Sequence, residues 1–221
     1  MNQQFLTELK AVTAENRIFT DEPMKKHTTF RVGGPADILV QPKGTELAAV
    51  IRLCRKYDVP YQVIGNGSNL LVGDRGIRGL VIEMLSKEDE ICVEDDCITV
   101  GAGMLLSKTA NRAAEHGLTG MEFAAGIPGR IGGAVVMNAG AYGGEMKDIL
   151  TAVTVLDQEG NEKILSAEEL ELGYRTSCIL KKGYIVTGAK IKLKHGEETA
   201  IRARTVSYTH LRAHETSAHL V

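Results

Sequence analysis

Residues 126–144 read GIPGRIGGAVVMNAGAYGG, and this stretch does most to decide the fold. It contains seven glycines, and its single charged side chain is that of Arg130. Pro128 fixes one φ angle, while the glycines remove side chains and let the backbone approach another group closely. Such a stretch can lie flat against a large planar apolar group and offer backbone donors to its heteroatoms. A tightly packed structural loop is the alternative interpretation.

A second glycine-bearing stretch, GNGSNLLV at residues 65–72, directly follows an apolar run. It contains the GxG pattern of a dinucleotide-binding turn, but Leu70 occupies the place of the third glycine, so the Rossmann fingerprint is not fulfilled. The two glycines still allow backbone N–H groups to converge into an anion-binding nest, and the neutral polar side chains suit a pyrophosphate. A tight turn between strands is the alternative here.

Composition narrows the class of protein. The chain has 221 residues, 43% of them hydrophobic, which is enough apolar material for a substantial core. Its 26 basic and 28 acidic residues give a net charge of −2, which argues against nucleic acid as a partner. The N-terminus lacks the pattern of a signal peptide, and the chain has no run suited to a membrane helix. We therefore expect a cytoplasmic protein with reduced cysteines, no metal and no membrane partner.

Apolar periodicity predicts two successive α+β units. In the first, strands are expected at 37–40, 61–64 and 80–83, with a helix at 45–57. The second is expected to begin near residue 85 with a hairpin at 91–100 and a helix at 105–116.

A later hairpin is expected at 151–165, followed by a short helix, because Ser166 and Glu169 have the spacing of a capping box. A last strand is expected where Ala189, Ile191 and Leu193 alternate with lysines.

Four motifs follow one another in the chain. They are HTTFRVGGPA at 27–36, GNGSNLLV at 65–72, GIPG through MNAGAYG at 126–143, and YRTS at 174–177. In content and order they resemble the motifs of the UDP-N-acetylenolpyruvoylglucosamine reductase (MurB) family, over about residues 20–204. The resemblance implies an α+β fold, the FAD-binding fold of the vanillyl-alcohol-oxidase (PCMH) type.

The same resemblance implies two FAD-binding subdomains, 1–84 and 85–204, that clasp the flavin between them. It assigns the 65–70 loop to the pyrophosphate and the 126–140 region to the flavin. The cofactor-binding residues expected on this basis are Gly65, Asn66, Gly67, Ser68, Asn69, Leu70, Gly126, Ile127, Pro128, Gly132, Gly133, Asn138, Ala139 and Gly140. Tyr142 and Tyr174 are expected to contact the substrate.

Arg175 is the expected catalytic residue. By the resemblance it stabilises negative charge on the enolpyruvyl carboxylate of a UDP-sugar substrate. Without the motif, a surface ion pair would be the ordinary interpretation of this arginine. The implied reaction uses NADPH to reduce noncovalently bound FAD and yields UDP-N-acetylmuramate, a precursor in peptidoglycan synthesis for the cell wall.

The chain also departs from the family pattern. The family has a proton-donating serine, in a Ser-Ala-Gly-Ser type motif, and a catalytic glutamate in a third, C-terminal domain, and the chain has neither. Ser177 belongs to the Tyr-Arg motif and is not the missing acid. Arg130 stands where a small residue is usual, so it is expected to reach a phosphate or to point to solvent.

These departures leave two other functions open. One is a truncated flavin-binding module without turnover, and we expect the chain alone to be inactive. The other is an FAD oxidase or dehydrogenase of the same superfamily with another substrate.

Residues 205–221 show neither periodicity nor a core-like pattern, and three of the six histidines fall in the last 12 residues. We expect a tail that is foreign to the family, disordered or artefactual. A frayed terminus and a metal-binding histidine cluster are the alternatives.

Overall fold

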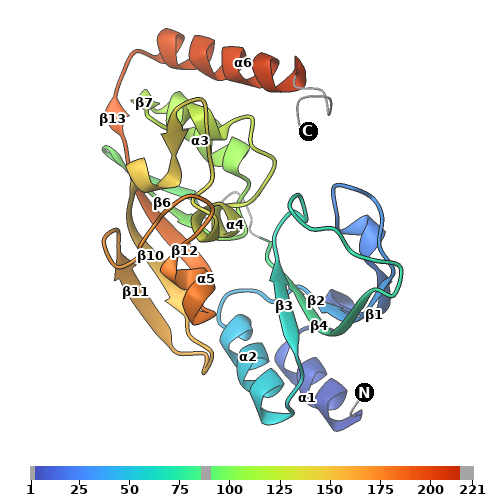
Figure 1. Ribbon diagram of the computed structural model, residues 1–221. Coiled ribbons are helices and arrows are strands. Elements are labelled where there is room, and N and C mark those ends of the chain that lie inside the picture. Colours follow the sequence, from blue (N-terminus) through green and yellow to red (C-terminus); the bar gives the residue numbers. More distant parts are fainter. Residues whose placement is uncertain (1–2, 86–90, 215–221) are drawn as a thin grey trace. The chain divides into compact units, whose positions relative to one another are not determined.

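The computed structural model describes residues 3–85 and 91–214 (Figure 1). The chain forms two compact units. Unit 1 comprises Met1–Ser86, Val155–Lys163 and Gly183–Ile185, and unit 2 comprises Lys87–Thr154, Ile164–Lys182 and Val186–Val221. The expected subdomains, 1–84 and 85–204, are each one continuous stretch, whereas unit 1 also contains two short segments from later in the chain.

Unit 1 is built on a four-stranded sheet with the order β1-β2-β4-β3. Strand β4 pairs parallel with both β2 and β3, so the carboxyl ends of these three strands lie at the same edge. Strand β1 pairs antiparallel with β2. The elements of this unit before residue 86 are α1 (Gln3–Val12), η1 (Glu15–Arg17), β1 (Ile18–Pro23), η2 (Met24–Lys26), β2 (Pro35–Val40), α2 (Glu46–Lys56), β3 (Tyr61–Ile64) and β4 (Ile77–Glu83).

One face of this sheet forms the main core of unit 1 with α1 and α2, which lie side by side in Figure 1. The apolar residues of α2 recur at helical spacing and are buried, as they are in α1. The strand expected at 61–64 and the helix expected at 45–57 are confirmed, with the helix one residue shorter at each end. The core-facing side chains include Phe5, Leu9, Ile38, Val50, Ile51, Leu80 and Ile82.

A five-stranded sheet with the order β11-β10-β12-β6-β5 passes through unit 2. Strand β6 pairs antiparallel with both β5 and β12. The remaining elements are β5 (Ile91–Glu94), β6 (Cys97–Gly101), α3 (Leu106–Glu115), β7 (Leu118–Thr119), η4 (Glu122–Ala124), α4 (Ile131–Val136), β8 (Gly140–Ala141), β9 (Gly144–Glu145), η5 (Met146–Asp148), β10 (Leu150–Leu156), β11 (Glu162–Ser166), α5 (Cys178–Lys182), β12 (Ile185–Lys192), β13 (Lys194–His195) and α6 (Glu198–His214).

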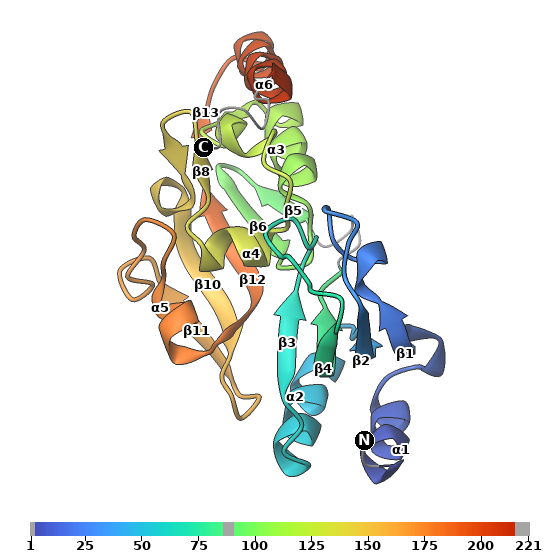
Figure 2. The ribbon, with the colours of Figure 1, turned by 45° about the vertical axis from the view of Figure 1, so that its right-hand side comes forward.

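The lysine-rich strand β12 has one wet face, as its pattern predicts. Ala189 and Ile191 are buried, whereas Lys190 and Lys192 are exposed. Both expected hairpins are confirmed, and α4 lies beside β6 (Figures 1 and 2). Within 3–85 and 91–214, no helix has both the length and the apolar character that crossing a bilayer requires.

The helix predicted from the capping box is wrong. Ser166 and Glu169 do make the reciprocal bonds, from Ser166 N to Glu169 Oε2 (2.8 Å) and from Glu169 N to Ser166 Oγ (3.4 Å), but turns follow instead of a helix. Glu171 adopts φ 47°, a left-handed backbone that stops helical propagation. A cap therefore forms here without the helix that it was expected to start.

Helix α6 continues from Glu198 through the expected family limit at residue 204 and ends at His214. The expected tail therefore begins inside a helix. Residues 215–221, including His219, lie outside the described residues.

Candidate functional site

The 65–70 loop of unit 1 directly follows β3, at the edge where the carboxyl ends of the parallel strands lie. Ligands of α/β sheets commonly bind at such an edge. Gly67 has φ +58°, and a Cβ atom there would lie 2.0 Å from the carbonyl oxygen of His27. Its own carbonyl accepts a hydrogen bond from Thr29 N at 3.2 Å. The loop therefore packs directly on the 27–36 motif, and only glycine fits at this contact.

His27 lies between two carboxylates. Its Nδ1 lies 3.2 Å from both carboxylate oxygens of Glu83, and its Nε2 lies 3.1 Å from Oε1 of Glu22. Burial raises the pKa of the Glu22 carboxyl, but hydrogen bonds from His27 and Lys26 outweigh burial, so that this pKa is lower than usual. Gln41 Nε2 also donates to Glu83, at 2.7 Å. This cluster fixes the start of the 27–36 motif against β1 and β4.

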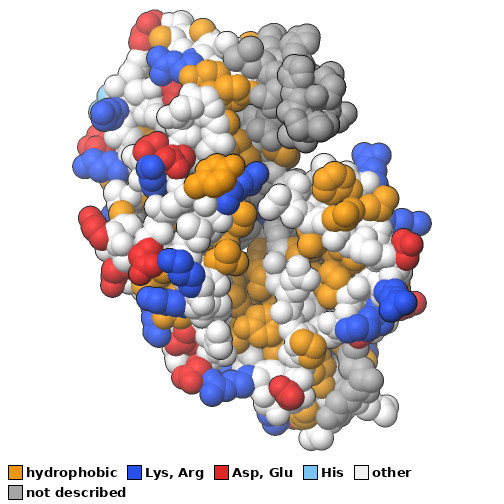
Figure 3. Space-filling model, in the orientation of Figure 1, with side chains coloured by type: hydrophobic (Ala, Val, Ile, Leu, Met, Phe, Trp, Pro, Cys, Tyr) orange, Lys and Arg blue, Asp and Glu red, His pale blue; other side chains and the backbone are white. Residues whose placement is uncertain are grey.

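The two loops at this edge also carry exposed apolar side chains. Phe30, Val32 and Leu71 are exposed, and Figure 3 shows hydrophobic side chains on the face of unit 1 that is turned to the viewer. Exposed apolar groups next to backbone donors are typical of a binding surface.

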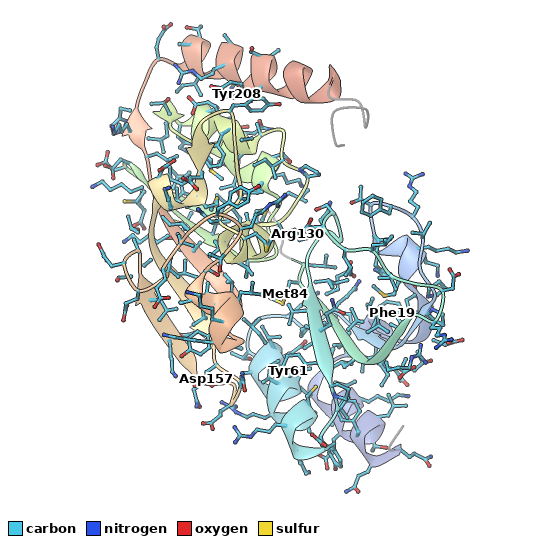
Figure 4. The ribbon with its side chains drawn as sticks, viewed as in Figure 1. Phe19, Tyr61, Met84, Arg130, Asp157 and Tyr208 are labelled. Carbon is cyan, nitrogen blue, oxygen red and sulfur yellow. The ribbon has the colours of Figure 1, made fainter. Side chains whose placement is uncertain are left out.

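In unit 2, the first half of the 126–144 stretch packs against residues 102–106. Ile131 N donates to Met104 O and Gly132 N to Ala102 O, each at 2.8 Å. The Arg130 guanidinium, labelled in Figure 4, donates to the carbonyl of Gly103. The side chain of Arg130 is therefore held within unit 2 and does not simply point to solvent, whereas its expected contact with a phosphate stays a prediction. This half of the stretch therefore packs on residues 102–106 of its own unit and leads into helix α4.

The second half of the stretch lines a pocket of about 460 Å³ within unit 2. The pocket contains seven of the residues expected from the sequence, but not Gly126, Pro128, Gly132 or Gly133. The expected residues Gly65 to Leu70 lie in unit 1. The pocket is lined by Ile127, Asn138, Ala139, Gly140, Ala141, Tyr142, Gly143, Gly144, Glu145, Tyr174 and Arg175.

Three residues of this pocket that are not glycine have a left-handed backbone: Asn138 (φ 43°), Tyr142 (φ 54°) and Arg175 (φ 54°). Tyr142 and Gly143 form the two-residue turn between β8 and β9, and both have positive φ, as a type I′ hairpin turn requires. Strained backbone of this kind persists where the surrounding structure holds it, and it gathers at functional sites.

The side chain of Asn138 connects three segments of the pocket. Its Nδ2 donates to Oε2 of Glu145 at 2.6 Å and to the carbonyl of Gly173 at 3.2 Å. Its Oδ1 accepts from Lys147 N at 2.9 Å. Both Nδ2 hydrogens therefore have protein partners, and the side chain forms part of the pocket wall.

Glu145 supports the same wall. Its side chain and that of Asp148 form a capping box at the start of η5. The Lys147 ammonium pairs with the Glu145 carboxylate and lowers its pKa, and Asn138 contributes to this shift. The pocket thus holds a carboxyl group whose pKa is lower than usual.

Tyr142 has a buried hydroxyl with no hydrogen-bond partner among the described residues. Its ring stacks on that of Tyr208 of α6, with ring centroids 4.6 Å apart and an angle of 10° between the planes. Figure 4 labels Tyr208. Because buried polar groups are almost always paired, this hydroxyl lacks a partner that a water or a bound molecule would supply.

Tyr174 and Arg175 form the tip of a tight turn. Gly173 N donates to Thr176 O at 3.1 Å, and Thr176 N donates to Gly173 O at 3.3 Å. Positive φ at Arg175 alone is the pattern of a type II turn, and Tyr174 is 94% exposed. The turn presents a cation and an aromatic ring at the pocket.

A larger pocket of about 810 Å³ lies in unit 1, beside the amino end of β3. Its one thiol is Cys54, and burial raises the pKa of that thiol to about 12, so it is no nucleophile at neutral pH.

In the part of the chain that the structure describes, no group of three or more His, Cys, Asp or Glu side chains could hold a metal ion.

Known proteins match both the sequence and the fold. A family model described as "FAD binding domain" matches residues 36–166. The UDP-N-acetylenolpyruvoylglucosamine reductase of Agathobacter rectalis is 50% identical over 205 residues, which cover 87% of this chain and 65% of the relative. The Clostridium perfringens reductase is 48% identical over 215 residues, covering 96% of this chain and 70% of the relative. The chain belongs to the UDP-N-acetylenolpyruvoylglucosamine reductase family.

Solved structures agree with this assignment. The MurB reductase of Thermus caldophilus has a TM-score of 0.74 and 40% identity, and the match covers 88% of this chain and 69% of that structure. For p-cresol methylhydroxylase the TM-score is 0.64 with 16% identity, covering 89% of this chain and 44% of that structure, which bears on the fold alone. The expected α+β fold of the vanillyl-alcohol-oxidase type, with FAD as cofactor, is confirmed.

The chain spans about two thirds of the length of the MurB reductases that it matches, from 65% to 70%. Four residues of the unit 2 pocket, Ala141, Gly143, Gly144 and Glu145, were not among the expected site residues, and neither were Glu22 and Glu83 of the unit 1 cluster at His27. Glu145 could have been found from the capping-box spacing Glu145-x-x-Asp148. Glu22 and Glu83 carry no local signal, because they meet His27 only after β1 and β4 join one sheet.

Proposed function

We propose that this MurB family member binds FAD noncovalently and uses NADPH to reduce UDP-N-acetylglucosamine enolpyruvate to UDP-N-acetylmuramate, in the cytoplasmic synthesis of peptidoglycan precursors. One observation carries the proposal. A single pocket of unit 2 gathers Arg175, Tyr174 and Tyr142 with the 138–140 segment. These are the residues that the family resemblance assigns to catalysis, to substrate and to flavin.

The residues present fit FAD. The unit 2 pocket falls in the usual range for small-molecule sites, roughly 300–1,000 Å³. Its unpartnered Tyr142 hydroxyl suits a heteroatom of the ring system or of the substrate. In unit 1, the 65–70 loop has the left-handed glycine that a backbone anion nest needs, and we assign it to the pyrophosphate.

When bound, FAD would supply the transfer of hydride from NADPH to the vinyl carbon of the substrate, and the neighbouring carbon would take up a proton from an acid. The side chains of the protein itself contribute a positive charge at the reacting group and hold the substrate in place. The Arg175 guanidinium stabilises the negative charge that develops on the enolpyruvyl carboxylate, an effect that depends on a fixed donor. Tyr174 and Tyr142 orient the UDP-sugar.

A flavin-binding module without turnover is the second candidate. It is supported by the match of the FAD-binding family model to residues 36–166, which by itself implies flavin binding and no reaction. An oxidase or dehydrogenase with another substrate is the third candidate, and fold likeness alone supports it.

Two measurements on the purified chain separate these candidates. The first is an FAD titration followed by flavin fluorescence, with heat denaturation to show that the flavin is released and not covalently attached. The second is NADPH oxidation with the enolpyruvyl substrate. Turnover supports the enzyme, and quenching without turnover supports the module. A chain that neither quenches nor retains flavin would contradict both.

The role of Arg175 is tested in a full-length relative that carries the same Tyr-Arg motif. Changing this arginine to alanine should leave FAD affinity nearly unchanged and slow reoxidation of the reduced flavin by substrate about 100-fold. Equal losses in flavin binding and in reoxidation would show a structural role.

A further inference from the structure

We infer that Asn138 and Ser177 are positioning residues that hold the Arg175 turn against the pocket wall. The inference rests on the proposed function only for the catalytic role of Arg175. The contacts that hold the turn, and the test of those contacts, are independent of the proposed function. From the sequence, Asn138 is expected to bind the cofactor and Ser177 has no expected role of its own, so positioning of the turn is a different use of both side chains.

The turn itself has little to hold it. Its tip residue Tyr174 is almost fully exposed, and Arg175 occupies a backbone region that costs energy for a residue with a Cβ atom. Two backbone hydrogen bonds between Gly173 and Thr176 close the turn but attach it to nothing else. Its position relative to the pocket must come from the residues at its two ends.

The first end is held by Asn138, which is only 5% exposed. Its Nδ2 donates to the carbonyl of Gly173, the residue before the turn tip, at 3.2 Å. The same amide is held by Glu145 and by the backbone of Lys147, so it cannot rotate without breaking two further bonds.

The second end is held by Ser177, which is fully buried. Its hydroxyl donates to the carbonyl of Val136 at 2.7 Å. Val136 is the last residue of α4, and Asn138 lies two positions later. Both ends of the turn are therefore tied to the same short segment, 136–138, which continues directly into the pocket wall at 139–145.

This arrangement explains how the left-handed backbone at Arg175 persists. Strained backbone persists only where neighbouring contacts hold it in place. Here one anchor on each side of the tip, Asn138 and Ser177, provides these contacts. Without one anchor the turn can relax, and the guanidinium no longer has one fixed place in the pocket. A catalytic cation is effective only when it is placed before the reaction begins.

Trypsin cleavage after Arg175 in the FAD-free chain tests the inference, because a protease needs the turn to open. Asn138→Asp keeps the size of the side chain but removes both donors, and Ser177→Ala removes one hydroxyl. For Ser177→Ala we expect cleavage at Arg175 to rise about fivefold, the effect of losing one ordinary hydrogen bond. For Asn138→Asp, which loses the bonds to Gly173 and to Glu145, we expect a larger rise. Cleavage after Arg31, in unit 1, is the internal reference and should not change.

A double variant separates positioning from general stability. In Asn138→Asp with Glu145→Gln, the new amide can donate to the new carboxylate, which restores the contact between these two residues. The Gly173 carbonyl still lacks its donor. We expect the thermal midpoint to recover in the double variant while cleavage at Arg175 stays raised. Cleavage that returns to the wild-type rate in the double variant, or that rises equally at Arg31 in the single variants, would overturn the inference.

FAD titration of the same proteins keeps the two proposals distinguishable. A chain that binds no FAD but shows raised cleavage at Arg175 in the variants would retain the positioning role and contradict the proposed function. A chain that binds FAD but shows unchanged cleavage at Arg175 in the variants would support the proposed function and contradict the positioning role.

Discussion

The two regions assigned to FAD solve the same backbone problem differently. In unit 1, the 65–70 loop reaches a left-handed conformation with a glycine, Gly67, and offers neutral donors. In unit 2, the pocket uses Asn138, Tyr142 and Arg175 in that conformation and holds them with side-chain hydrogen bonds and packing. The left-handed backbone of unit 1 can be recognised from the sequence, because a glycine adopts it. The left-handed backbone of the unit 2 pocket depends on contacts between distant parts of the chain.

The largest effect is expected from Gly67→Ala. The new Cβ atom would lie 2.0 Å from the His27 carbonyl, and the residue would keep an unfavourable φ of +58°. We expect a loss of about 3 kcal/mol in the free energy of unfolding, because strain and overpacking add. FAD affinity should fall as well, because the loop cannot keep its shape. Urea unfolding and FAD titration measure the two effects.

Gly73→Ala is the matched control. Gly73 is exposed, lies near the same loop and has nothing within 4 Å of the position of a Cβ atom. We expect a change within about 0.5 kcal/mol. If the two variants lose the same free energy of unfolding, the 65–70 loop does not depend on glycine at position 67. The difference between this loop and the unit 2 pocket would then not hold.

A smaller loss is expected from Gly140→Ala in the pocket wall. A Cβ atom there would lie 2.7 Å from both the Cβ atom of Glu145 and the carbonyl oxygen of Gly144, but the backbone is not left-handed. Without the conformational part of the cost, we expect about 2 kcal/mol from overpacking alone. The free energy of unfolding in urea checks this value, and a loss as large as that of Gly67→Ala would contradict it.

Gly133→Ala serves as its control and also tests a cofactor assignment. Gly133 is an exposed residue of α4 with open space around it, so alanine should stabilise the FAD-free chain by about 0.5–1 kcal/mol. If the flavin lies against this glycine, the added methyl group should weaken FAD binding about tenfold. Unchanged FAD affinity would remove Gly133 from the proposed cofactor site.

Much of the fold could be predicted because periodicity acts locally. The buried face of α2 and the wet face of β12 each follow from residues a few positions apart. The capping box at Ser166 shows the limit of local signals. Its hydrogen bonds form as expected, but the left-handed backbone at Glu171 ends the segment before a helix can develop.

The site was predicted less completely than the fold, because it depends on contacts that local sequence signals do not report. Motifs pointed to Tyr142, Tyr174 and Arg175, which share one pocket in unit 2. They did not show that the first half of the 126–144 stretch packs on residues 102–106, or that Arg130 bonds to Gly103. Such contacts join segments far apart in the sequence, and residue types alone do not specify them.

The smallest expected effect concerns pH, and it distinguishes the two regions directly. The 65–70 loop has no titratable side chain, whereas the pocket wall contains Glu145, whose pKa is lowered by the Lys147 ammonium and by Asn138. A carboxyl with a lowered pKa in the folded chain contributes stability that is fully present above its ordinary value, about 4.3, and is lost as pH falls through the lower value. Between pH 5 and pH 3, hydrogen exchange in segment 140–145 should therefore lose more protection in the wild type than in Glu145→Gln, whose amide does not titrate. Segment 65–70 should change equally in the two proteins. An equal loss in segment 140–145 would show that this carboxylate does not stabilise the wall, and the side-chain support of the pocket would then rest on Asn138 and Ser177 alone.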